Sequence, residues 1–119
     1  EMVPIQARVE KRTKDVVIIS TLEGEVVATE REPTPKYIGR GDGFNSDGAT
    51  MKDFCSYLED FGIFNYPVLD ETGTLTAYEI DFSFDPENPE SFREAMKKYG
   101  LQYAKASREI EVLVLYLRD

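Results

Sequence analysis

Apolar and polar side chains alternate most regularly from Tyr78 to Phe84, where Tyr, Ile and Phe are interleaved with Glu, Asp and Ser. This alternation is typical of a strand with one buried face and one solvent-exposed face. Residues 15–20 and 110–117 differ, because apolar side chains occupy both faces of each segment. These two segments are therefore predicted to be strands that need cover on both sides.

Two further segments have the helical period. Thr50 is a good N-cap for the first, with Asp53 three residues later in a capping-box arrangement, and Gly62 is placed to end it. The second has Asn88 as cap, Pro89 at its first position and Gly100 after its end. The predicted buried stripes are Met51, Phe54, Cys55, Leu58 and Phe61, and Phe92, Ala95, Met96 and Tyr99.

Turn-forming residues separate these elements. Residues 5–29 are predicted to be strands, with 26–28 following the segment 15–20. Further strands are predicted at 67–69 and 101–106, with turns at 22–25, 70–74 and 107–109. Residues 30–48 are rich in Pro, Gly, Asn and Asp and lack apolar anchors, so they are predicted to be a long, mobile surface loop.

The order of elements predicts a single α+β domain over residues 1–119. Residues 1–48 supply strands and the long loop, and residues 49–119 form a helix-strand-strand-helix-strand-strand unit. The expected architecture is a two-layer sandwich, with two helices on one face of a mostly antiparallel sheet. A length of 119 residues fits one domain. The predicted core contains Phe54, Leu58, Ile80, Phe82, Phe92 and Met96.

The last strand admits two interpretations. Ile110, Val112, Val114 and Tyr116 lie on one side of it, and Leu113, Leu115 and Leu117 lie on the other. We favour the interpretation in which residues 1–48 fold over the second face and make these leucines core residues. In the other, Leu113, Leu115 and Leu117 form a docking surface for another domain or a second copy.

Composition narrows the classes of function. The net charge is −9, from 23 acidic and 14 basic residues, which disfavours binding to nucleic acids and anionic membranes. The chain has no His, so Ser-His and Cys-His nucleophiles and the common zinc ligand sets are excluded. Its single Cys cannot form an internal disulfide. The longest apolar run, 112–117, is far too short to span a membrane.

Three groups of residues invite a chemical role. Cys55 lies on an apolar helical stripe without a base, so we interpret it as a buried thiol. The carboxylate pairs are interpreted as turn formers or solvated side chains. These pairs are Glu59 with Asp60, Asp70 with Glu71, and Asp85 with Glu87.

The glycine-rich segment 39–48 contains Arg40-Gly41-Asp42, an integrin-recognition tripeptide that arises easily by chance. It also contains Asp42 and Asp47, which could form a weak cation site, although a solvated loop is the favoured interpretation. No catalytic, cofactor-binding or metal-binding residue is assigned.

Several stretches together resemble a known family. Tyr66-Pro67-Val68-Leu69-Asp70-Glu71-Thr72-Gly73, Tyr78-Glu79-Ile80-Asp81-Phe82 and Ile110-Glu111-Val112-Leu113-Val114 resemble the bacterial "soil-associated protein" family, a domain of unknown function. The resemblance implies a secreted or envelope-associated bacterial protein and supplies no catalytic residues. The element order is more loosely similar to the short N-terminal domains of secretins and TonB-dependent receptors, which are protein–protein interaction modules.

From these features we expect a non-enzymatic interaction or accessory module of the bacterial envelope, periplasmic or extracellular, with a protein partner. Two alternatives stay open. One is a carboxylate-based, carbohydrate-active hydrolase, which needs acidic residues gathered in a cleft. The other is a small-molecule-binding domain, which needs an apolar cavity. The chain begins with Glu1 rather than Met, which fits either a processed protein or an excised domain.

Overall fold

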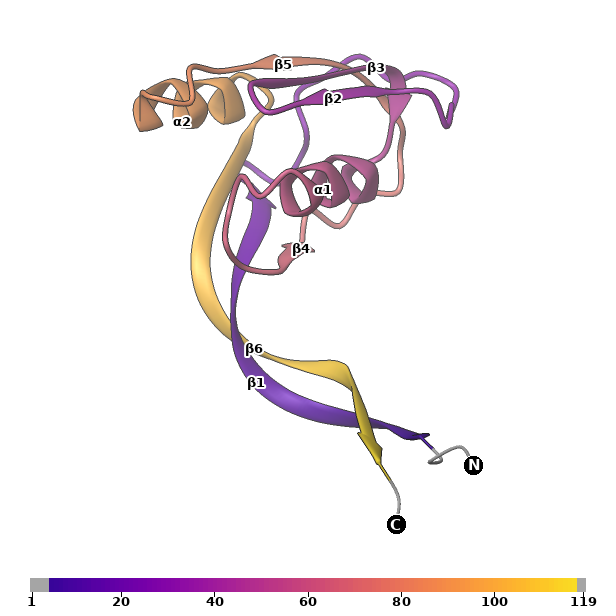
Figure 1. Ribbon diagram of the computed structural model, residues 1–119. Coiled ribbons are helices and arrows are strands. Elements are labelled where there is room, and N and C mark those ends of the chain that lie inside the picture. Colours follow the sequence, from indigo (N-terminus) through magenta and orange to yellow (C-terminus); the bar gives the residue numbers. More distant parts are fainter. Residues whose placement is uncertain (1–4, 118–119) are drawn as a thin grey trace.

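The computed structural model describes residues 5–117, and the side chains of residues 6–116. Two helices and mostly antiparallel strands form an α+β sandwich, which confirms the predicted fold class (Figure 1). In chain order the elements are β1 (Ile5–Thr21), β2 (Ile38–Arg40), β3 (Gly43–Ala49), α1 (Met51–Asp60), β4 (Val68–Asp70), β5 (Tyr78–Ser83), α2 (Pro89–Lys98) and β6 (Leu101–Leu117).

The strands divide into two three-stranded sheets, where the sequence suggested one. The first has the order β4-β1-β6 and the second β2-β3-β5. Helix α1 packs on β3 and β4, and α2 packs on β5 and β6, so each helix contacts both sheets. The second sheet exists because residues 38–49 supply two strands that were not predicted.

The helix boundaries follow the predicted caps. Thr50 Oγ1 accepts a hydrogen bond from the Asp53 amide at 3.2 Å, and the Asp53 carboxylate accepts one from the Thr50 amide at 3.1 Å. Asn88 Oδ1 accepts from the Glu90 amide at 3.1 Å. Gly62 and Gly100 follow the two helices with φ of 64° and 70°. These local signals fixed both helices because each satisfies backbone groups that a helix end leaves unpaired.

The predicted core is confirmed, since all six of its residues belong to one buried cluster. Phe82 is 1% exposed, and its ring centroid lies 5.1 Å from that of Phe54 and 5.5 Å from that of Phe92. Phe44, which is fully buried, adds its ring at 5.6 Å from Phe54. The core is therefore largely aromatic and joins both helices to the β2-β3-β5 sheet.

The prediction of an unanchored loop over residues 30–48 is wrong. Residues 38–49 form a β-hairpin whose second strand, β3, pairs with β5 and buries Phe44. A Cβ on Gly43 would lie 2.7 Å from the Phe82 carbonyl oxygen. Glycine at this position allows two backbones to approach closely, a role that composition alone does not distinguish from loop flexibility.

Two other predictions about strands are wrong. Residues 26–28 form no strand, although Val26 packs in the core. Residues 107–109 do not turn, because β6 runs unbroken for 17 residues and pairs these positions with residues 13–15 of β1. Residues 101–117 contain no Gly, Pro or Asn to enforce a turn, and Ser107 Oγ donates to Asp15 Oδ1 at 3.3 Å across the strands.

Strands β1 and β6 are far longer than the core that they enter. Residues 16–106, the head, contain both helices and the whole buried cluster. Residues 5–15 and 107–117, the ribbon, continue as a two-stranded antiparallel arm that leaves the head and bends along its length (Figure 1). The radius of gyration of 17.1 Å exceeds the roughly 14 Å of a compact domain of this length, which reflects this arm.

Candidate interaction surface

The ribbon has only two strands with which to bury its side chains. Residues that lie opposite each other in an antiparallel pair project from the same face. Val9 lies opposite Leu113 and Ala7 opposite Leu115, so these four share one face, which we call the apolar strip. On the other face Arg8, Glu10 and Arg12 lie opposite Val114, Val112 and Ile110.

On the face that carries Arg8, Glu10 and Arg12, the charged side chains pair with one another. Glu10 Oε1 pairs with Arg8 Nη2 at 2.5 Å, and Glu10 Oε2 with Arg12 Nη2 at 2.6 Å. The hydrogen bond from Arg12 holds the pKa of Glu10 below its usual value, with the Arg8 charge adding to the effect. The Arg8 guanidinium also lies over the Tyr116 ring, 5.3 Å from its centroid. These side chains lie beside Val112 and Val114 and leave both only half-exposed.

Within the described residues the apolar strip has no such cover. Val9, Leu113 and Leu115 are 63%, 66% and 64% exposed, and Ala7 is exposed as well. Isolated exposed apolar residues are ordinary, but a contiguous apolar surface on a projecting arm indicates an interaction site. The favoured interpretation, in which residues 1–48 cover Leu113 and Leu115, is therefore wrong. The side chain of Leu117 lies outside the described part.

Strand β1 is covered on both faces where it enters the head, at residues 16–19. Val16 and Val17 are 0% and 3% exposed, and Ile18 and Ile19 are 7% and 0% exposed, although successive residues point to opposite faces. Strand β4 pairs with β1 only at residues 17–19. The third strand therefore ends where the core ends, and residues 5–15 extend beyond it with an open edge.

The ribbon also differs from the head in charge. Residues 16–106 hold 8 basic and 17 acidic side chains, whereas the ribbon holds 5 basic and 4 acidic ones. The acidic character of the chain is thus a property of the head. The ribbon is close to neutral, so a partner that docks on it meets little net charge to desolvate or repel.

Cys55 lies where the sequence predicted, within α1 and 4% exposed. Burial raises the pKa of its thiol to about 12, and the nearby carboxylates of Asp70 and Glu59 add to the rise. The thiol is therefore protonated at neutral pH and is a poor nucleophile.

The candidate carboxylates hold the chain together locally. Glu59 Oε1 accepts a hydrogen bond from the Val68 amide at 2.8 Å, which ties α1 to β4. Asp70 Oδ1 accepts from the Thr72 amide at 2.9 Å, and Asp85 Oδ1 from the Glu87 amide at 3.0 Å, as expected of turn formers. Glu59 and Asp70 both lie near Cys55, where α1 meets β4, whereas Asp85 lies near the start of α2.

The acidic residues of the hairpin are also separated. Asp42 lies in the turn between β2 and β3, where its Oδ1 is 3.5 Å from Nε of Arg40, and Asp47 lies within β3. Five residues along a strand span about 16 Å, too far for one ion to bridge. Within residues 5–117 no group of three or more His, Cys, Asp or Glu side chains is placed to hold a metal ion.

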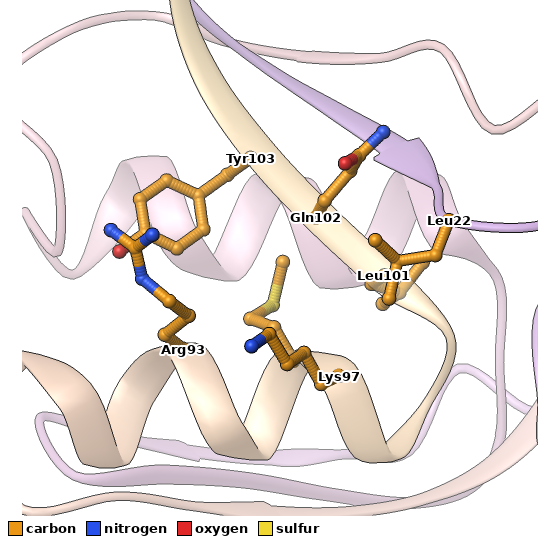
Figure 2. A pocket seen from close by; sticks show the side chains of 7 residues that line it. Leu22, Arg93, Lys97, Leu101, Gln102 and Tyr103 are labelled. Atoms are coloured by element: carbon orange, nitrogen blue, oxygen red, sulfur yellow. The ribbon is translucent and has the colours of Figure 1, made fainter.

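The head carries several hollows of different sizes. One of about 150 Å³ lies between α2 and β6, where the Arg93 side chain reaches from the helix to the Tyr103 ring and Lys97 lies one turn further along the helix (Figure 2). The Arg93 guanidinium lies 5.7 Å from the Tyr103 ring centroid. Both cations also approach a carboxylate on their own helix, at 3.8 and 3.9 Å. They are therefore partly neutralised surface charges and do not make an anion site.

A second hollow, of about 210 Å³, is lined by aromatic rings that include Phe64, Phe84, Phe92 and Tyr103. Its volume is smaller than the roughly 300 Å³ of the smallest typical small-molecule pockets. A wider depression of about 490 Å³ lies beside β2, where Tyr37 and Ile38 are 44% and 62% exposed. It is a surface feature of the hairpin and does not reach the core cluster.

Comparison with protein families places these features in context. A family model described as "Protein of unknown function (DUF3738)" matches residues 7–116. The chain belongs to this family. The sequence resemblance to a domain of unknown function is confirmed to that extent. The comparison with curated proteins returned no match, and the comparison with solved structures returned none. Within residues 5–117 no helix is long and apolar enough to cross a membrane.

The DUF3738 match includes almost the whole ribbon. Its limits, residues 7 and 116, enclose all four residues of the apolar strip. The arm is therefore part of the family's domain. Leu113 and Leu115 are recognisable from the sequence, but Ala7 and Val9 are not, because the charged residues around them hide the alternation. The signal that could have found them is the pairing of β1 with β6.

Proposed function

We propose that this DUF3738 protein is a non-enzymatic protein-interaction or accessory module and that the ribbon is its contact element. The observation that carries the proposal is the apolar strip, in which Val9, Leu113 and Leu115 are each more than 60% exposed. Apolar surface of this kind gains free energy when a partner removes it from water. A two-stranded arm in water is also only marginally stable by itself, so a partner would stabilise the ribbon too.

Features of the head support the same choice over a hydrolase. General acid–base chemistry on a glycan needs two carboxylates that face one substrate at a defined separation. Glu59, Asp70 and Asp85 are instead each bound to a backbone amide of the head. The thiol of Cys55 is buried and held protonated. A hydrolytic activity on a glycan or peptide panel that a single Asp or Glu substitution abolishes would defeat the proposal.

We place the module in the bacterial envelope or outside the cell. This location rests on the sequence resemblance to the "soil-associated protein" family and, more loosely, to the interaction domains of secretins and TonB-dependent receptors. Immunodetection in fractionated cells tests it. Recovery of the protein in the periplasmic, membrane or extracellular fractions is expected, and recovery only with cytoplasmic markers would contradict it.

The contact role of the ribbon is tested by photo-crosslinking in cells that produce the protein naturally. A photoreactive side chain replaces Leu113 in one variant and Leu75 in another. Leu75 is the matched control, because it is apolar and 95% exposed but lies in the head. We expect a discrete protein adduct from position 113 and none from position 75. Equal labelling from both positions, or none from position 113, would contradict the proposal.

A further inference from the structure

The ribbon surface is self-complementary. We propose that it forms a weak symmetric dimer in which the apolar strips of two copies of this chain pack face to face. This inference rests on the proposed function and names a second copy as the partner. The two-fold axis runs along the ribbon, so that β1 of one copy lies over β6 of the other. Aligned sheets pack in this way about 10 Å apart.

The sizes of the apolar residues fit this arrangement. Each row of the ribbon is one cross-strand pair, and the relevant rows hold Ala7 with Leu115 and Val9 with Leu113. When β1 lies over β6 of the partner copy, each small side chain faces a leucine. Alternation of small and large side chains across an interface lets the two layers interdigitate. If β1 lay over β1 instead, leucine would face leucine.

The adjacent row adds charge complementarity. Lys11 and Glu111 lie opposite each other on the same face as the strip, next to Val9 and Leu113. Within the described part of the chain neither has an ion-pair partner within 4.0 Å. In the proposed dimer each Lys11 faces Glu111 of the other copy, which gives two ion pairs related by the two-fold axis. The next row, Thr13 with Glu109, brings no like charges together.

The size of the surface limits the affinity. A face two strands wide and eleven residues long covers on the order of 400 Å², about half of the area that each partner buries in a standard interface. We therefore expect a dissociation constant in the micromolar range or above, so the dimer depends on protein concentration. Because the two-fold axis runs along the ribbon, the two acidic heads lie at the same end of the dimer. Their repulsion, which physiological salt screens over about 8 Å, weakens the association further.

Sedimentation equilibrium of four samples tests the arrangement: the wild type, Lys11→Glu, Glu111→Lys, and an equimolar mixture of the two variants. Lys11→Glu makes the row negative at both positions, and Glu111→Lys makes it positive at both. Each variant alone should therefore associate at least about tenfold more weakly than the wild type. In the mixture a negative row faces a positive row, so heterodimers should form with roughly wild-type affinity.

The mixture separates association from folding. Each variant chain keeps its own like-charged pair in the mixture, so the rescue cannot come from improved folding of the monomer. Lys14→Glu is the matched control, since it makes the same change in net charge on the opposite face, at the position facing Arg108. It should leave association unchanged.

Three results would overturn the proposal: a wild-type protein that stays monomeric up to about 1 mM, single variants that associate like the wild type, or a mixture that associates no better than its components. An adduct from position 113 to a different protein, with a monomeric wild type, would overturn the dimer while leaving the interaction role of the ribbon intact.

Discussion

At the scale of single residues, the buried thiol of Cys55 gives the head a defined dependence on pH. The folded thiol has its pKa raised to about 12 by burial, whereas the thiol of an unfolded chain ionises near roughly pH 8.5. The native state therefore holds this proton more tightly. The thiol's contribution to stability is complete below the unfolded pKa and is lost as the pH rises towards the folded one.

Comparison with Cys55→Ala isolates this contribution. Denaturant unfolding of both proteins between about pH 7 and pH 11 should show that the wild type loses its advantage over the variant as the pH rises. Tyrosines and lysines titrate in both proteins and cancel in the difference. A difference that stays constant over this range would mean that the thiol is not buried in solution.

Phe82 is the residue on which the aromatic core depends most directly. It is 1% exposed and lies between the rings of Phe54 and Phe92. Phe82→Ala should lower the free energy of unfolding by on the order of 3–5 kcal/mol. Phe61→Ala, at a ring that is 48% exposed, should cost clearly less. If denaturant titrations showed equal losses at the two positions, Phe82 would not point into the core and the buried face of β5 would be assigned incorrectly.

At the scale of elements, the hairpin of β2 and β3 depends on glycines that admit close contacts. A Cβ on Gly48 would collide with the backbone carbonyl oxygen of Glu32, while a Cβ on Gly41 would meet nothing within 4 Å. Gly48→Ala should therefore cost about 1–3 kcal/mol of stability, and Gly41→Ala no more than about 0.5 kcal/mol. Thermal unfolding of both variants checks this. A tolerated Gly48→Ala would mean that residues 30–48 are the loose loop that the sequence suggested.

Local signals explain which elements the sequence could predict. Both helices carry caps that satisfy their own ends, and β5 shows its buried face as plain alternation, so each could be identified without tertiary information. Strand β3 could not be identified in this way. Its glycines are needed because the backbones of Phe82 and Glu32 lie close by, and the sequence does not show that proximity. Strand β6 was divided at residues 107–109 because polar residues within a strand and polar residues in a turn look alike in sequence.

The apolar strip shows the same limit at the candidate interaction surface. Its β6 half is visible as Leu113 and Leu115, but whether those leucines are core or surface depends on where β4 ends and how far β1 continues. Pairing of β1 with β4, about 50 positions away, decides the first, and pairing of β1 with β6, about 100 positions away, decides the second. A pattern that requires cover on two faces is therefore ambiguous in sequence, because it fits either a core strand or an exposed apolar surface.

The whole molecule is an acidic head with a nearly neutral arm. Its principal extents are 55 × 29 × 28 Å, and the arm accounts for the long dimension (Figure 1). The head has its own buried core and the arm has none, so the two parts differ in what stabilises them. In the proposed division of roles the head supplies the stable scaffold, and the arm presents the contact surface.

The most direct test of this account is the free energy of unfolding of Leu115→Lys. Leu115 is 64% exposed on the apolar strip, so a lysine there should change the stability by no more than about 0.5 kcal/mol. Leu58→Lys, at a fully buried position of α1, is the matched control and should unfold the head. If Leu115→Lys instead lost several kcal/mol, as expected for a charge placed in a core, the strip would be buried in solution, and the ribbon could not be the contact surface.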